Sequence, residues 1–279
     1  MGANPSFADV PIDRVRDFWN RAPCNIRHSN KAVGTREYFD EVERRKYFVE
    51  PHIPAFASFE SWAGRRVLEI GCGIGTDTVS FARAGAQVTA VELSEASAAL
   101  ARTRVQVYGL SDRVTIHLGN AEELPQILPR QPFDLVYSFG VVHHSPHPRR
   151  IVEHVRDYMT RQSELRLMLY ARVSYKLFSI MKEEGIWDMA RIDELIARRS
   201  EAHTGCPVTY TYHDEAARTL LEGFAISEMR KAHIFTWDVD AYKRHEYVKA
   251  AEWADVSDDD LAALERELGW HLLIRARLA

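Results

Sequence analysis

The chain has 279 residues, of which 46% are hydrophobic and 27% are charged, a composition typical of a globular protein with a sizeable core. Its 36 basic and 40 acidic residues give a net charge of −4, which argues against a surface built to bind nucleic acid. No apolar run reaches the length of a membrane span. The first residues also lack the basic start and apolar centre of a signal peptide. We therefore expect a cytoplasmic protein.

The first 62 residues are predicted to form a helical cover rich in aromatic side chains. Apolar and aromatic residues recur at helical spacing over 12–22 and again over 35–50, where Pro51 ends the run. A third, shorter helix should end at Gly64.

Residues 63–172 are predicted to form the core of an α/β domain, because apolar strands alternate with helices of ten residues or more. Such strands are buried on both faces of a parallel sheet, and right-handed connections then give a doubly wound arrangement. The expected strands cover residues 65–70, 87–93, 113–120, 133–140 and 164–172.

Residues 173–213 interrupt this alternation with two amphipathic helices and an irregular stretch, which we interpret as a helical lid insertion over the substrate. Residues 214–279 return to the core sheet. They should add a strand over 224–235 and a final strand over 270–278. The expected fold class is thus a doubly wound, seven-stranded, mostly parallel sheet with a helical cover and a helical lid.

The sequence VLEIGCGIGTDT follows the first strand and predicts a nucleoside site at the strand's carboxyl end. Glycines stand at 71, 73 and 75, but Thr76 occupies the place of the third glycine of the dinucleotide fingerprint. Glu69 offers a carboxylate to a positive charge, and Glu92, 21 residues after Gly71, has the spacing of an acid that binds ribose. A ligand with a ribose and a cationic group but no phosphates fits both acids. S-adenosylmethionine (SAM) is such a ligand, whereas NAD is disfavoured.

Residues 66–142 resemble the class I SAM-dependent methyltransferases, on four motifs in order: VLEIGCGIGTDT, AVELS, GNAEELP and FDLVYSFGVVHH. The last is similar to the small-molecule methyltransferases of ubiquinone synthesis. The resemblance implies a Rossmann-like methyltransferase fold that binds SAM, with S-adenosylhomocysteine as the product. Two departures are Asn120, where the family often has Asp, and TRQSE at 160–164 in place of a glycine-rich turn. The cofactor-binding residues that it implies are Glu69, Gly71, Cys72, Gly73, Gly75, Thr76, Glu92, Leu93, Asn120, Ala121, Glu122, Ser138 and Phe139.

His143 and His144 follow the fourth strand, where a general base would take the proton of the acceptor. The alternative is that one histidine packs or caps the next helix and the other shapes the pocket. We expect no metal, since Cys24, Cys72 and Cys206 are widely spaced and no cluster of acids follows the strand. The wide spacing also disfavours a site for arsenite.

Aromatic residues outside the core motifs predict an enclosed, partly apolar acceptor pocket. Arg172 is a candidate partner for an acceptor carboxylate, or else a surface cation, and Arg44 or Arg45 is a candidate for the methionine carboxylate. Most of the aromatic residues, taken singly, are equally explained as packing of the lid. The candidate substrate-binding residues are Trp19, Tyr38, Tyr170, Arg172, Tyr175, Tyr210 and Tyr212.

The function that the sequence favours is metal-independent, in-line transfer of a methyl group to an oxygen or nitrogen of a small molecule. A nucleic-acid acceptor is disfavoured, because SFGVV replaces the Asn/Asp-Pro-Pro-aromatic sequence typical of enzymes that methylate base amines. The alternatives left open are a SAM-binding regulatory protein, a methyltransferase for a macromolecule and a nicotinamide-dependent oxidoreductase. The sequence leaves the acceptor and the oligomeric state undetermined.

Overall fold

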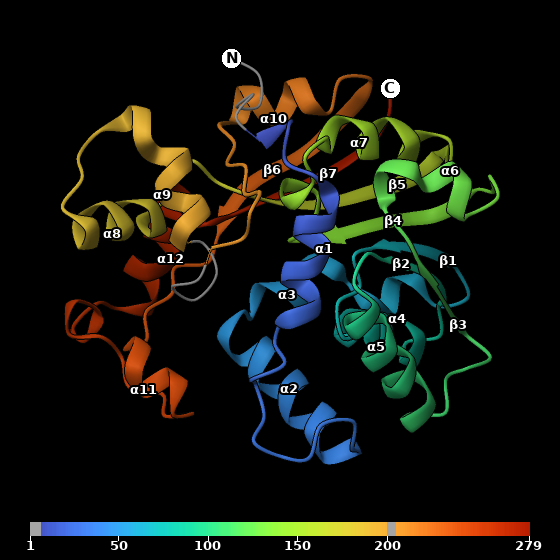
Figure 1. The fold of residues 1–279 in the computed structure, drawn as a ribbon, viewed down its shortest axis with the longest axis horizontal. Helices are drawn as coiled ribbons and strands as arrows, with labels where there is room; N and C mark the ends of the chain where they lie inside the picture. Colours follow the sequence, from blue (N-terminus) through green and yellow to red (C-terminus); the bar gives the residue numbers. More distant parts are fainter. Residues whose placement is uncertain (1–6, 200–204) are drawn as a thin grey trace.

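The computed structural model describes residues 7–199 and 205–279, and its centre is a seven-stranded sheet in the order β3-β2-β1-β4-β5-β7-β6. The first five strands pair in parallel, and β7 runs antiparallel to both β5 and β6. The predicted doubly wound, mostly parallel sheet is confirmed (Figure 1). The strands are β1 (Arg66–Ile70), β2 (Gln87–Glu92), β3 (Val114–Leu118), β4 (Phe133–Phe139), β5 (Met159–Tyr170), β6 (Phe224–Ala232) and β7 (His271–Leu278).

Helices cover both faces of this sheet. They are α1 (Ile12–Arg21), α2 (Arg36–Val49), α3 (His52–Ala57), α4 (Thr76–Arg83), α5 (Glu95–Val107), α6 (Leu124–Ile127), α7 (Pro148–Arg156), α8 (Tyr175–Glu184), α9 (Ile192–Arg199), α10 (Asp214–Leu220), α11 (Val239–Lys243) and α12 (Asp258–Leu268). None of the helices in the described part of the chain is both long and apolar enough to cross a membrane.

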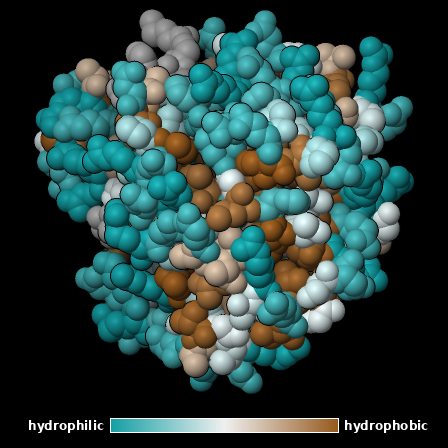
Figure 2. Space-filling model, turned by 45° about the vertical axis from the view of Figure 1, so that its right-hand side comes forward, coloured by the Kyte–Doolittle hydropathy of each residue, from teal (hydrophilic) through white to brown (hydrophobic). Residues whose placement is uncertain are grey.

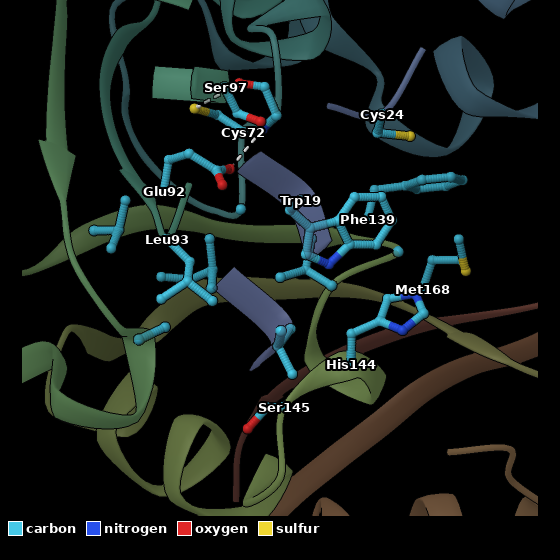
Figure 3. Close-up of a pocket in the computed structure, with 18 of the residues that line it drawn as sticks. Trp19, Cys24, Cys72, Glu92, Leu93, Ser97, Phe139, His144, Ser145 and Met168 are labelled. Carbon is cyan, nitrogen blue, oxygen red and sulfur yellow. Dashed lines mark hydrogen bonds between the residues drawn. The ribbon is translucent and has the colours of Figure 1, made fainter. Parts of the chain in front are cut away.

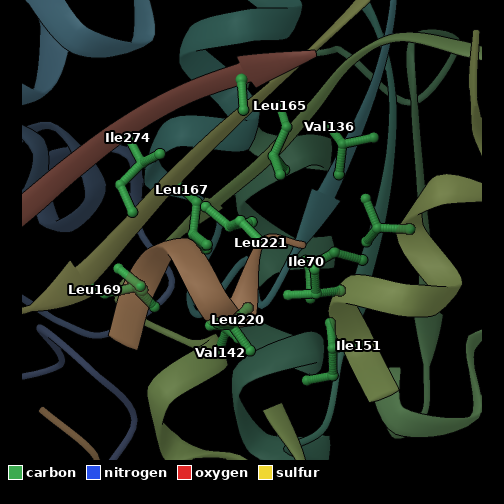
Figure 4. Close-up of a cluster of buried hydrophobic side chains, with 14 of the residues drawn as sticks. Ile70, Val136, Val142, Ile151, Leu165, Leu167, Leu169, Leu220, Leu221 and Ile274 are labelled. Atoms are coloured by element: carbon green, nitrogen blue, oxygen red, sulfur yellow. The ribbon is translucent and has the colours of Figure 1, made fainter. Parts of the chain in front are cut away.

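The two faces of the sheet carry separate apolar clusters. On one face, α7 and α10 pack against β4, β5 and β7, as Figure 4 shows for Ile151 and Leu220. On the other face, α3, α4, α8 and α9 pack against the same sheet. Neighbouring residues of β1 point to opposite faces, and Val67 and Leu68 are both buried, one in each cluster. The continuous apolar pattern of the strands therefore reflects burial on both sides.

The N-terminal helices are joined to the core by polar contacts. Asn20 of α1 accepts a hydrogen bond from Ser94 Oγ at 2.8 Å at the start of α5. Arg104 of α5, which has no exposed surface, donates to Phe39 O at 3.1 Å and to Thr76 Oγ1 at 2.5 Å. Figure 1 shows α1 crossing in front of the sheet, with α2 and α3 below it. These helices therefore roof the edge of the sheet where β1, β2 and β4 end.

Two strands differ in extent from those expected. β5 begins at Met159 instead of 164, and its pairing with β4 shifts register between Phe133 and Leu135. Ser163 Oγ donates to Phe133 O at 2.5 Å there, in the segment that lacks the glycine-rich turn. β6 ends at Ala232, because His233 adopts a left-handed backbone (φ 72°).

Two connections of the sheet carry helices beyond the regular alternation of strand and helix. α8 and α9 lie between β5 and α10, where the sequence predicted two helices, and α11 and α12 lie between β6 and β7. The segment from His233 to Trp270 is therefore a second insertion. Figure 2 shows one face of the molecule, where hydrophobic side chains gather in a band between hydrophilic ones.

Candidate functional site

A pocket lies at the carboxyl ends of β1, β2 and β4, below the N-terminal helices (Figure 3). The core lines it with the glycine turn, the end of β2 and the segments that follow β3 and β4. The cover adds Ile12, Val15 and Trp19 from α1 and Lys46 from α2. The pocket thus has a floor made of strand ends and a roof made of helices, which is the usual ligand position in an open α/β sheet.

The glycine turn borders the pocket with backbone and few side chains. Gly71 (φ 76°) donates its N–H to Val91 O at 2.7 Å, and a Cβ at this position would lie 2.3 Å from Val141 Cγ2. No atom lies within 4 Å of the position that a Cβ on Gly73 (φ 53°) would take. Cys72 and Thr76 also line the pocket, whereas Gly75 packs against Ala101 of α5. Bare backbone therefore borders the pocket, as a closely approaching ligand requires.

Glu92 at the end of β2 is held in place by backbone donors. Gly73 N donates to Glu92 Oε2 at 2.8 Å and Ser94 N donates to Glu92 Oε1 at 2.9 Å. Burial raises the pKa of Glu92 to about 7, although the backbone hydrogen bonds oppose this shift. The carboxylate lines the pocket together with the neighbouring Leu93, so a ligand with two hydroxyl donors finds a fixed acceptor there.

Glu69 does not line the pocket but lies behind the turn. Its Oε2 accepts a hydrogen bond from Thr78 Oγ1 of α4 at 2.5 Å. Burial, together with the nearby charge of Asp77, raises its pKa to about 8. Glu69 therefore supports the start of α4 from inside the protein.

The segments after β3 and at the end of β4 also contain both residues that line the pocket and residues that turn away from it. Asn120 and Ala121 line the pocket, and Asn120 Oδ1 accepts a hydrogen bond from Glu122 N at 3.0 Å. Glu122 turns away and accepts from Ser145 Oγ at 2.5 Å. After β4, Phe139 lines the pocket, while Ser138 Oγ donates to Ile70 O at 3.0 Å. Ser138 and Glu122 therefore join structural segments instead of facing a ligand.

Lys46 is the cation that α2 brings to the pocket, in place of the expected Arg44 or Arg45. Its Nζ lies 2.7 Å from Asp77 Oδ1. Burial alone would lower the pKa of Lys46, but the charges of Asp77 and Glu50 raise it overall. Arg44 is exposed, and Arg45 stacks on the ring of Tyr242 at 4.1 Å. Lys46 follows the buried Val42 by four residues, and residues i and i+4 of a helix share a face. This spacing could have indicated that Lys46 points inward.

The two histidines after β4 have different surroundings. His144 lines the pocket, its ring meets Trp19 edge-on at 5.5 Å, and its Nδ1 lies 2.8 Å from Val208 O. A carbonyl oxygen only accepts, so Nδ1 carries the proton and the neutral ring has its lone pair on Nε2. His143 is fully buried and does not line the pocket, and the centre of its ring lies 3.8 Å from that of Tyr170. Burial holds the pKa of His143 well below its ordinary value.

Trp19 and Tyr170 are the two predicted substrate residues that the structure places in the pocket wall. Tyr38 lies elsewhere, buried under the cover, where its hydroxyl donates to Ile26 O at 2.8 Å. Arg172 pairs with Asp193 of α9 at 2.6 Å, so it connects the end of β5 to that helix.

The remaining predicted aromatic residues pack outside the pocket. Tyr175 of α8 donates its hydroxyl to Glu252 Oε1 at 3.2 Å. Tyr210 donates its hydroxyl to Pro146 O at 3.3 Å. Tyr212 donates its backbone N–H to Tyr170 O at 2.8 Å, which extends the pairing beside β5. These three residues therefore make contacts within the protein and do not face the pocket.

Histidines from distant parts of the chain meet beside the pocket. His271 at the start of β7 lines the pocket with Glu50, and the two side chains lie 3.7 Å apart. His52 Nε2 lies 2.9 Å from His271 Nδ1, and the ring of His233 lies 4.8 Å from that of His271. Burial lowers the pKa of His52 to about 2 and that of His233 to about 4. No sequence pattern indicates this group, because its members come from segments separated by most of the chain.

Residues 67–162 match a family model described as a methyltransferase domain. The chain is 46% identical over 144 residues to a release factor glutamine methyltransferase of Gloeobacter violaceus, covering 48% of this chain and 49% of that protein. It is 39% identical over 90 residues to a ubiquinone biosynthesis O-methyltransferase of Aromatoleum aromaticum, covering 32% of this chain and 37% of that protein. The chain therefore spans about half or less of the length of these curated relatives.

Among solved structures, the fold is similar to the magnesium protoporphyrin IX methyltransferase of Synechocystis with bound S-adenosylhomocysteine. The TM-score is 0.61 at 16% identity, over 96% of this chain and 100% of that one. At this identity the likeness concerns the fold. Together with the matched domain and the four motifs, it shows that this chain contains a class I SAM-dependent methyltransferase domain whose cofactor is SAM.

Proposed function

We propose that this protein transfers the methyl group of SAM to an oxygen or nitrogen of a small-molecule acceptor. The observation that carries the proposal is the construction of the pocket. One half offers a fixed carboxylate, Glu92, beside bare backbone at Gly73. The other half is walled by Phe139, Met168 and Tyr170 and holds His144.

The cofactor half suits the polar parts of SAM. Glu92 would accept hydrogen bonds from the ribose hydroxyls, and the bare turn leaves room for the amino-acid end. Asn120 and Ala121, in the segment after β3, line the pocket and would contact the adenine. Lys46 supplies the charge for the methionine carboxylate, and its raised pKa keeps it a cation. The residues present therefore fit the cofactor.

The acceptor half suits an in-line transfer. Bound SAM supplies an electrophilic methyl group on a sulfonium, so the protein has mainly to align the acceptor and exclude water. The apolar walls do both. His144 Nε2 carries the lone pair in the neutral ring, because Nδ1 donates to Val208 O, and it can therefore take a proton from the acceptor.

A small acceptor is favoured by the roof of the pocket. Ile12, Val15 and Trp19 of α1 lie over it, and α1 is held to the start of α5 by Asn20. A concave pocket that has aromatic and apolar walls as well as polar groups at fixed places is typical of small-molecule sites.

Calorimetric titration with SAM and with NAD tests the cofactor half. We expect binding of SAM and none of NAD. Glu92→Ala should weaken SAM binding by roughly 30- to 100-fold, the effect of losing hydrogen bonds to a charged acceptor, and Glu92→Gln by about 10-fold. An affinity for SAM that is unchanged in both variants would contradict the proposed site.

A screen with SAM labelled in the methyl group, over amines, hydroxy acids and phenols, tests the transfer. Product formation in one class identifies the acceptor atom. Tight binding of SAM with no transfer to any member would favour a regulatory SAM-binding protein. Transfer only to a protein or nucleic acid would favour a macromolecular acceptor.

A further inference from the structure

Three side chains with metal-binding atoms converge beside the pocket: Glu50, His233 and His271. One potential ligand atom of each lies within 4.8 Å of those of the other two. We propose that these residues form a binding site for a divalent transition-metal ion. The sequence predicted no metal, because the three residues belong to separate segments and match no ligand spacing.

The fold brings the three residues together at one end of the sheet. His271 is the first residue of β7, and His233 directly follows Ala232, its partner in β6. Trp270 N donates to His233 O at 2.8 Å, which fixes the two segments to each other. Glu50 caps the C-terminus of α2, and Pro51 separates it from His52 at the start of α3. The site therefore joins the cover to the strands of the second insertion.

Two imidazoles and one carboxylate are a known type of metal-binding set. Zinc in hydrolytic enzymes and non-haem Fe(II) both use two histidines and one carboxylate and keep other coordination positions open. Imidazole nitrogens and a carboxylate oxygen are the ligands that such ions take in proteins. The set therefore favours Zn²⁺, Fe²⁺ or Co²⁺ over Mg²⁺ or Ca²⁺, which prefer oxygen ligands.

His52 contacts the ring nitrogen of His271 that does not face Glu50. His271 presents Nε2 toward Glu50, at 3.7 Å from Oε1, and its Nδ1 lies 2.9 Å from His52 Nε2. A histidine that binds a metal through one nitrogen usually donates the other N–H to a fixed acceptor. His52 can be that acceptor, which orients the His271 ring with Nε2 toward the metal.

The separations require a modest contraction on binding. For three atoms at most 4.8 Å apart, some point lies within about 2.8 Å of all of them. Bonds from zinc to histidine or carboxylate are about 2.0–2.2 Å. Shifts of several tenths of an ångström in each side chain would therefore close the site. His233 has a left-handed backbone, which is uncommon for a residue other than glycine. Such a conformation is often kept where a side chain must point in a specific direction.

Glu50 and His271 also line the pocket, so an open coordination position would face the acceptor half. If the protein is a methyltransferase as proposed above, the ion would bind an acceptor oxygen there and favour its deprotonated form. The binding of the metal itself does not depend on that function.

The first experiment measures metal binding by the full chain in the absence of SAM. Protein stripped with EDTA and dialysed is titrated with Zn²⁺ by calorimetry and with Co²⁺ by visible absorption. We expect one equivalent of each ion. His271→Gln and His233→Asn should weaken binding at least 100-fold, and His52→Gln by about 10-fold, as for partners of metal ligands. His213→Ala is the control, since His213 is exposed and makes no side-chain capping bond.

Folding of the variants is checked by circular dichroism and thermal denaturation in EDTA. Asn is chosen for position 233 because it tolerates a left-handed backbone. If wild-type protein binds no ion, or if the folded His271→Gln and His233→Asn variants bind as the wild type does, the site does not exist. These outcomes leave SAM binding, measured separately, as the test of the proposed function.

The second experiment tests the open position. Azide is titrated into the Co²⁺ form of the full chain. A change in the visible bands that saturates with azide, and that His271→Gln abolishes, supports a coordination position open to the pocket. Bands that do not change with azide would show a closed site and overturn this placement.

Discussion

The two halves of the pocket are built in different ways. The cofactor half comes from one turn and the ends of adjacent parallel strands, with Gly73 and Glu92 in direct contact. The acceptor half is assembled from α1, the ends of β4 and β5 and the start of β7, which are spread over the whole chain. Where the backbone must take a particular shape, the sequence carries a recognisable motif at one place. Where side chains from distant segments converge to form a pocket, the sequence carries no such motif.

If the two halves are separate in function, substitutions in each should change different measurements. The largest effect is expected for His144→Ala. Loss of a general base typically costs roughly 100-fold or more in turnover, whereas the affinity for SAM should stay within about threefold. Turnover with the acceptor found in the methyl-transfer screen is measured from pH 6 to 9.

His147→Ala is the matched control for His144. His147 lies in the same segment but does not line the pocket. Equal turnover of His144→Ala and His147→Ala across the pH range would remove His144 from the mechanism. The acceptor half would then act by alignment alone.

A smaller effect is expected on the cofactor side from Lys46→Met. Removing the cation that would pair with the methionine carboxylate should weaken SAM binding about 5- to 10-fold, a loss of about 1–1.4 kcal/mol. Calorimetry measures the affinity. Arg44→Met is the control, since Arg44 is the exposed neighbour in the same helix. Equal effects of the two substitutions would indicate only a general contribution of charge.

An effect on stability, and none on the pocket, is expected for Glu69, which lies behind the pocket. Its pKa is raised from an ordinary value of 4.5 to about 8 by burial, so the folded protein holds a proton that the unfolded chain releases. Stability is therefore lost as the pH rises toward 8. In Glu69→Gln this loss should be smaller by about 1–3 kcal/mol between pH 5 and 8.

Urea denaturation at several pH values measures that difference, with Glu60→Gln as the exposed control. Parallel stability curves for Glu69→Gln and wild type would show that Glu69 is ionised in the folded protein. It would then be available to a positive charge, as the sequence first suggested.

The sheet and the cofactor turn were predictable because both depend on short-range patterns. Apolar runs buried on two faces identified the five parallel strands, and the spacing from Gly71 to Glu92 identified the two sides of one crevice. The sequence could not distinguish His143 from His144, since the choice depends on Tyr170 and Val208 packing beside them. It also placed the end of β6 at residue 235 and not at Ala232, because the break at His233 depends on contacts with Trp270.

Arg104 connects the cover to the helix that follows the glycine turn, with no surface exposed to water. Deleting the N-terminal helices would remove Phe39 and Glu43, two of the three hydrogen-bond partners of this guanidinium, at a cost of several kcal/mol. The N-terminal helices are therefore part of the domain, and we expect the cover and the sheet to unfold together in one cooperative transition. A change in acceptor preference would then arise by substitution of single residues in the pocket wall, with the N-terminal helices retained.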